Sequence, residues 1–189
     1  MADASHWRMK PVVALVAAAL LSVPAAADAG GYVALGVGSA ADTGGDLRGF
    51  SSDGHMSGRL MLGQRISIVS FEAGLAGYGL EPRSGGRDYN AQSLGAALKL
   101  NLPLVAGLEG YGRAGVERTW LGTSGDQMAY SGNGYVVGGG LEYGFELPLT
   151  RLSVWFDWTR HGADLVPDGR GQTLDAQADL WTLGLSVAL

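Results

Sequence analysis

Apolar and polar residues alternate along most of the chain after residue 28. Neighbouring side chains of a β-strand point to opposite faces, so a period of two predicts strands with one apolar face. Clusters of Gly, Asp, Ser and Pro separate the alternating segments, as turns do between strands. The predicted strands are residues 31–39, 55–64, 67–79, 92–101, 107–119, 134–146, 151–160 and 177–189. The sequence therefore predicts an all-β fold.

The connections between these segments alternate in length. Short connections lie near Arg65, Pro103 and Pro148. The other connections are long and polar, and they comprise residues 40–54, 80–91, 120–133 and 161–176. Short turns at one end and long loops at the other are typical of barrels that cross the bacterial outer membrane. We therefore expect residues 28–189 to form an eight-stranded antiparallel up-and-down transmembrane β-barrel.

The charged residues of the predicted strands separate by parity. The apolar parity, with Leu35, Phe71 and Leu183 as examples, is expected to carry no charge along the strands. An Arg or Lys facing lipid at mid-bilayer would cost about 2–4 kcal/mol, so this parity must face outward. A soluble, lipocalin-like barrel would instead place the charged parity in a dry core, which is costly. The predicted inward charges are Arg59, Glu72, Lys99, Arg113, Glu117, Glu142 and Asp157.

The inward charges are expected to pair in a packed lumen. A tight turn at Arg65 and Ile66 would place Arg59 opposite Glu72 as a cross-strand partner. Arg113 is the expected partner of Glu142, with Lys99, Glu117 and Asp157 completing the network. Eight strands enclose a lumen only wide enough for side chains, so small inward residues should make room for large ones. The inward glycines are Gly36, Gly63, Gly74, Gly95, Gly115, Gly138, Gly140 and Gly184.

The N-terminus has the pattern of a secretory signal. Arg8 and Lys10 precede an apolar core at residues 12–23, and small residues follow at 25–27. That core is shorter than the roughly 20 residues that a transmembrane helix needs. We expect residues 1–27 to be a signal peptide that is cleaved near Ala27.

Composition narrows the possible functions. The net charge of −5 gives no basic surface for nucleic acid, and there is no cysteine for a disulfide or a cysteine-linked lipid. Acidic loop residues could bind a hard cation, but their spacing matches no known metal loop, so no metal and no cofactor are expected. The loop carboxylates considered are Asp42, Asp46, Asp53, Asp164, Asp168 and Asp175.

The C-terminal part of the chain resembles a known family. The segments Gly138–Gly144, Leu152–Trp158 and Leu183–Leu189 are similar to the last three strands of OmpA-like outer-membrane barrels. The resemblance implies that Glu142 pairs inside the barrel and that the last strand is recognised by the barrel-assembly machinery. The residues implied in this assembly signal are Gly184, Leu185, Val187 and Leu189.

Two positions depart from the family pattern, and they limit what it implies. The chain has Leu189 where the family ends in an aromatic residue, and Ser153 where the family has an inward arginine. Glu142 therefore needs another partner. The separate peptidoglycan-binding domain of OmpA itself is not expected.

These observations favour a non-enzymatic outer-membrane barrel with a structural or surface-recognition role through its extracellular loops. Its expected partners are outer-membrane lipid and lipopolysaccharide. One alternative is a lipid A-modifying hydrolase, which would need His55 or His161 to meet a serine and an acid. We expect His161 to be a solvated histidine at the rim. A second alternative is a narrow solute channel, which the packed lumen disfavours.

Overall fold

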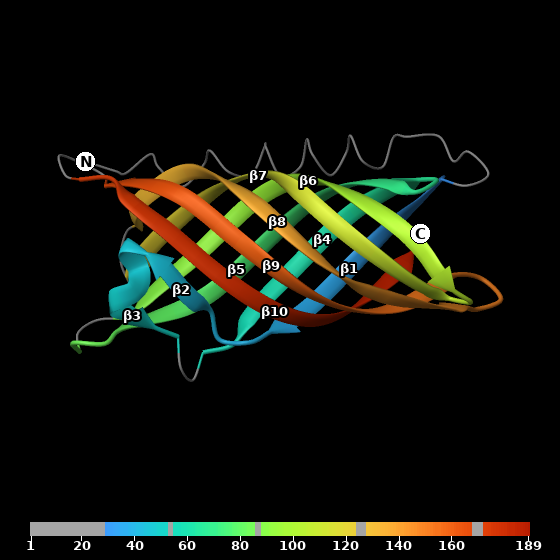
Figure 1. The fold of residues 1–189 in the computed structure, drawn as a ribbon, viewed down its shortest axis with the longest axis horizontal. Coiled ribbons are helices and arrows are strands. Elements are labelled where there is room, and N and C mark those ends of the chain that lie inside the picture. Colours follow the sequence, from blue (N-terminus) through green and yellow to red (C-terminus); the bar gives the residue numbers. More distant parts are fainter. Residues whose placement is uncertain (1–28, 53–54, 86–87, 124–127, 168–171) are drawn as a thin grey trace, which may run out of the picture.

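The fold is a closed antiparallel barrel (Figure 1). The computed structural model describes residues 29–52, 55–85, 88–123, 128–167 and 172–189, so the predicted signal peptide lies outside the described residues. Each long strand pairs with the next, and pairing of the first with the last closes the ring. The long strands are β1 (Ala29–Gly38), β4 (Ser57–Ile66), β5 (Val69–Pro82), β6 (Tyr89–Val105), β7 (Leu108–Thr123), β8 (Met128–Glu146), β9 (Arg151–Pro167) and β10 (Leu174–Ala188). The predicted eight-stranded antiparallel barrel is confirmed.

Short turns connect the strands at the end where the chain terminates. Residues 67–68 join β4 to β5, and Ala106 and Gly107 join β6 to β7. The first turn lies at residues 67–68, two positions beyond the predicted turn at Arg65 and Ile66, and Ser67 adopts a left-handed conformation there with a φ of 59°. Arg59 consequently faces Ala76 across the hairpin, and the predicted position opposite Glu72 is wrong. The residue opposite Arg59 changes from Glu72 to Ala76, a shift of an even number of residues, so each side chain stays on its predicted face of the wall.

Over most of their length the two faces of the wall separate as their parity predicts, with Arg118 and Arg160 as outward exceptions on β7 and β9. Leu35, Phe71 and Leu185 are 61%, 49% and 52% exposed on the outside. The predicted inward charges are buried, with Glu142 partly so. The barrel therefore presents an apolar outer belt around a polar interior.

No helix in the described ranges is long and apolar enough to cross a membrane.

At the end opposite the short turns, the strands are longer than predicted. The segments 80–91, 120–133 and 161–176, predicted as loops, begin and end as strand in their described residues. There β5 continues to Pro82, β7 to Thr123 and β9 to Pro167. In contrast, β1 and β4 have only 10 residues each. The wall is therefore low on the side of β1 and β4.

The segment predicted as the polar loop 40–54 folds into a cap over the low side of the wall. It contains β2 (Asp42–Gly45), the 3₁₀ turn η2 (Asp46–Gly49) and β3 (Phe50–Ser51). β2 pairs with β10 and β3 with β5, so the cap bridges two walls on either side of β1 and β4. The Asp175 backbone N–H donates to Asp46 Oδ2 at 2.9 Å, which fastens the cap to β10.

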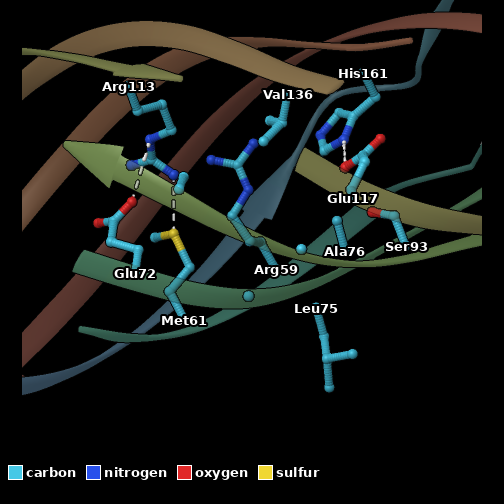
Figure 2. Close-up of a pocket in the computed structure, with 13 residues that line it drawn as sticks. Arg59, Met61, Glu72, Leu75, Ala76, Ser93, Arg113, Glu117, Val136 and His161 are labelled. Atoms are coloured by element: carbon cyan, nitrogen blue, oxygen red, sulfur yellow. Dashed lines mark hydrogen bonds and ion pairs between the residues drawn. The ribbon is translucent and has the colours of Figure 1, made fainter. Parts of the chain in front are cut away.

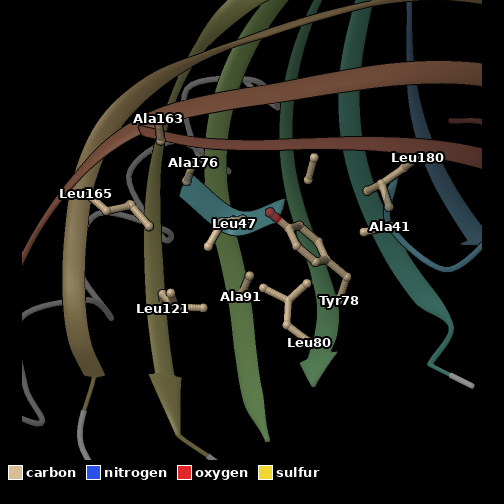
Figure 3. Close-up of a cluster of buried hydrophobic side chains, with 11 residues drawn as sticks. Ala41, Leu47, Tyr78, Leu80, Ala91, Leu121, Ala163, Leu165, Ala176 and Leu180 are labelled. Atoms are coloured by element: carbon tan, nitrogen blue, oxygen red, sulfur yellow. The ribbon is translucent and has the colours of Figure 1, made fainter. Parts of the chain in front are cut away.

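Leu47 inserts the cap into the barrel (Figure 3). It is 1% exposed and lies in a cluster of buried apolar side chains from the strands below. We call this set the mouth cluster. It comprises Ala41, Leu47, Tyr78, Leu80, Ala91, Leu121, Ala163, Leu165, Ala176, Ala178 and Leu180. The segment folds inward because Leu47 can exchange water for an apolar interior.

Candidate functional site: the barrel lumen

Asp157 is the centre of an ion-pair cluster at mid-lumen. Its side chain is fully buried, and the Arg59 Nη1 atom donates to Asp157 Oδ2 at 2.9 Å. Arg113 Nη2 lies 3.2 Å from the same oxygen, and the Tyr111 hydroxyl donates to it at 3.0 Å. These residues come from β9, β4 and β7, which are not neighbours in the sheet. The contacts therefore join the walls across the lumen.

Glu72 completes this cluster through Arg113 (Figure 2). Arg113 Nε lies 3.6 Å from Glu72 Oε2, and the Tyr32 hydroxyl donates to the other carboxylate oxygen. Arg113 thus lies between two carboxylates, whereas Arg59 pairs with Asp157. The predicted pair of Arg59 with Glu72 is wrong because the shifted hairpin register separates them along the barrel. Two arginines and two carboxylates balance the charge.

A second layer lies closer to the short turns. Lys99 Nζ is 2.6 Å from Glu142 Oε2, and it also lies 4.1 Å from the centre of the Tyr111 ring. Glu142 accepts a further hydrogen bond from Ser186. The prediction that Arg113 pairs with Glu142 is therefore wrong. Lys99, from β6, replaces the arginine that the family resemblance implied for this glutamate.

The sequence analysis missed a third layer at the same end. Glu109 pairs with Arg65 at 2.7 Å and with Arg151 at 3.2 Å. All three residues share the inward parity of their strands, so the alternation contained the signal. Arg65 lies just beyond the predicted strand 55–64, whereas Glu109 and Arg151 lie inside the predicted strands 107–119 and 151–160.

His161 and Glu117 form a pair on the other side of the central cluster. His161 Nδ1 is 2.7 Å from Glu117 Oε2, and the two side chains are 7% and 2% exposed. The prediction of a solvated rim histidine is wrong because β9 continues past it and keeps its side chain inward. Glu117 therefore binds His161 and lies apart from the Asp157 cluster.

Cavities remain in the described part of the lumen, and two of them lie apart from each other. The smaller, of about 40 Å³, is lined by Arg59, Glu117 and His161, among others (Figure 2). Arg59 Nη2 and His161 Nε2 have no hydrogen-bond partner among the described residues, and a cavity of this size has room for water. The larger, of about 180 Å³, lies beside Lys99 and Arg151 near the short turns. The cavities share no lining residue, which agrees with a lumen filled between them.

Each of the two described histidines pairs with a glutamate. His55 Nε2 is 2.7 Å from Glu81 in an exposed pair, and the nearby Ser52 hydroxyl donates to the Ala41 carbonyl. His161 Nδ1 is bonded to Glu117. No described group of three or more His, Asp or Glu residues is placed to hold a metal ion.

The residues of the implied assembly signal lie in the closing strand. Leu185 and Val187 face outward, and the Leu189 N–H donates to the Gly31 carbonyl at 2.7 Å. Gly184 faces inward, where an added Cβ would lie 2.2 Å from the Trp155 ring. Their role in assembly stays a prediction.

The family is decided by a comparison with models of protein families. The model of the outer membrane protein beta-barrel domain matches residues 13–188, nearly the whole chain. The chain belongs to this family. It is thus a barrel of the bacterial outer membrane, and the resemblance to OmpA-like barrels is confirmed at the level of the family. The end with short turns is then periplasmic, and the cap is extracellular.

A solved structure shows the same fold. Neisserial surface protein A is 18% identical, with a TM-score of 0.64 over 83% of this chain and 96% of that one. The outer membrane protein OprG from Pseudomonas aeruginosa is 14% identical, with a TM-score of 0.39 over 86% of this chain and 97% of that one. No curated protein sequence matches this family member.

Proposed function

We propose that this family member is a non-enzymatic scaffold of the outer membrane that presents a fixed extracellular surface. The observation that carries the proposal is the double closure of the lumen. The Asp157 cluster fills it at mid-height, and the mouth cluster closes it on the extracellular side. Strand pairing and hydrogen bonds fix the cap, so its outer face keeps a defined shape for recognition.

Conductance in planar bilayers tests the closure. The purified, folded protein should give no stable steps at a concentration where a general porin does. Arg113→Ala removes the side chain between Glu72 and Asp157 and should produce small or intermittent currents. Arg48→Ala changes an exposed residue of the cap and, like the wild-type protein, should give no stable current steps. Reproducible porin-sized steps from the wild-type protein would refute the proposal.

Mass analysis of lipid A separates the scaffold from a hydrolase. Cells that express the protein should contain the same lipid A species as cells without it. Loss of an acyl chain that depends on His55 would contradict the proposal. The sensitivity of the cells to detergent tests the structural role. Cells without the protein should be more sensitive, and complementation with the wild-type chain or with His55→Ala should restore normal resistance.

A further inference from the structure

Two arginines depart from the apolar outer face. Arg118 on β7 and Arg160 on β9 have the outward parity, next to the inward Glu117 and His161. The expectation of an outer face without charge therefore fails at the extracellular ends of these strands. An arginine facing the hydrocarbon would be costly, so the two side chains must lie where the lipid becomes polar.

Strand length places both arginines at that level. Arg118 is the eleventh residue of β7, counting Leu108 as the first, and Arg160 is the tenth of β9, counting Arg151 as the first. A membrane-crossing strand uses about 9–11 residues. Both side chains therefore emerge where the outer leaflet's head groups begin.

Aromatic side chains surround the arginines. The Arg118 guanidinium lies 5.7 Å from the Trp120 ring centre, and that of Arg160 lies 5.5 Å from the Trp158 ring centre. Tyr135 on β8 is paired with Val116 on β7 and with Gly162 on β9. Arg118 is two residues after Val116 and Arg160 is two residues before Gly162, so Tyr135 lies between the two arginines. We call Arg118, Trp120, Tyr135, Trp158 and Arg160 the arginine–aromatic patch.

The patch has open and oriented cationic groups. Arg160 donates from Nε and Nη2 to the two carboxylate oxygens of Asp179 at 2.8 and 2.7 Å, which orients the guanidinium. Arg118 donates to Ser131 Oγ at 3.4 Å, and it makes no ion pair with any described carboxylate. The cationic character of Arg118 is thus not neutralised within the described wall.

The patch lies on one side of the barrel only. On β5 and β6 the outward residues near the same end include no arginine or lysine, as Gly77, Gln92 and the acidic Glu81 show. Met56 just before β4 is 72% exposed. A ring of interfacial aromatics that merely anchors the barrel would not require this asymmetry.

We propose that the arginine–aromatic patch is a binding site for a phosphorylated glycolipid of the outer leaflet, the lipid A part of lipopolysaccharide. Guanidinium groups bind phosphate oxygens with paired, charge-assisted hydrogen bonds. Trp and Tyr rings lie at head-group level beside acyl chains, where their apolar and polar parts are both satisfied. Arg118 binds one phosphate, and Arg160, oriented by Asp179, contributes a second cationic group beside Tyr135.

Native mass spectrometry of the folded protein in detergent tests the site. The probes are bisphosphorylated lipid A, the same lipid without phosphate, and phosphatidylglycerol. The double variant Arg118→Gln/Arg160→Gln should bind bisphosphorylated lipid A about tenfold more weakly or worse, since charged hydrogen bonds are lost. Its binding of the phosphate-free lipid should not change. The matched control Arg48→Gln/Arg83→Gln alters two exposed arginines away from the patch and should bind like wild type.

Three results would overturn the proposal: unchanged lipid A binding by the patch variant, an equal loss in the control, or equal binding of phosphatidylglycerol and lipid A by the wild type. Heat-dependent gel migration verifies that each variant is folded. If the double variant fails to fold, lipid binding by the wild-type protein alone tests the proposal. Its preference for the phosphorylated lipid should shrink as salt screens the arginines, and a preference that is absent or insensitive to salt would contradict the site.

Discussion

The mid-lumen and the mouth of this barrel fill the same kind of space with opposite chemistry. At mid-height the inward positions carry Arg59, Glu72, Arg113 and Asp157, and the outer face is apolar. Above the membrane the inward positions carry the apolar mouth cluster. Polar residues occupy outward positions there, as Asn90, Asp164 and Gln177 show.

The exchange of apolar and polar residues between the two faces follows from the solvent outside the barrel wall. Where lipid surrounds the barrel, apolar residues are placed outside and the polar ones must satisfy each other within. Where water surrounds it, burial of apolar side chains inside is the favourable arrangement, as in a soluble protein. A single strand therefore has its apolar side chains on the outside within the membrane and on the inside above it. The alternation continues, and only its polarity reverses.

The largest effect should come from breaking the mid-lumen cluster. Asp157→Leu leaves two buried arginines without their shared carboxylate, so the free energy of unfolding should fall by about 3–5 kcal/mol. Urea unfolding in detergent, followed by tryptophan fluorescence, measures it. Asp179→Asn removes a carboxylate from a partly exposed pair at the barrel surface and should cost no more than about 1 kcal/mol. Similar losses in the two variants would show that burial does not strengthen the cluster.

The mouth cluster should respond differently, because the cap is a local element. Leu47→Ala removes a fully buried side chain, a change that typically costs about 2–5 kcal/mol. We expect that cost to open the cap while the barrel stays folded. Hydrogen exchange should then rise in residues 42–51, with the unfolding midpoint nearly unchanged, and Arg48→Ala should have neither effect. A global loss of stability in Leu47→Ala would mean that cap and barrel unfold together.

Packing against Trp155 gives a smaller effect. Gly184→Ala would place a Cβ 2.2 Å from the Trp155 ring, whereas nothing lies within 4 Å of a Cβ at Gly58. Overpacking typically costs about 1–3 kcal/mol, so Gly184→Ala should destabilise the barrel and Gly58→Ala should not. Unfolding midpoints of the two variants make the comparison. Equal stability would show that the lumen has room to spare at this level.

The smallest effect distinguishes the observed pairs from the predicted ones. A double-mutant cycle with Lys99→Met and Glu142→Gln should give a coupling of about 0.5–3 kcal/mol, because the two groups are 2.6 Å apart. The cycle of Arg113→Met with Glu142→Gln should give a weaker coupling. Unfolding free energies of the four variants in each cycle provide both values. A stronger coupling for Arg113 would contradict the observed layers.

The sequence by itself determined the barrel and the two faces of its wall. The period of two and the separation of charge by parity were sufficient, because each depends on the local geometry of a strand and on the cost of a charge in lipid. The same parity predicted that Asp157 and Lys99 lie inside. It could also have revealed Glu109 and Arg151, which share it.

Tertiary structure decided which charges pair and where the strands end. Arg59 binds Asp157 because the turn at Ser67 shifts the hairpin and because β4 and β9 face each other across a closed ring. His161 is buried because β9 continues past it to Pro167 and keeps its side chain inside the barrel beside Glu117. The cap folds inward because Leu47 packs into the mouth cluster, whose other residues come from strands far along the chain. Such contacts join distant segments, so the local alternation of residues cannot specify them.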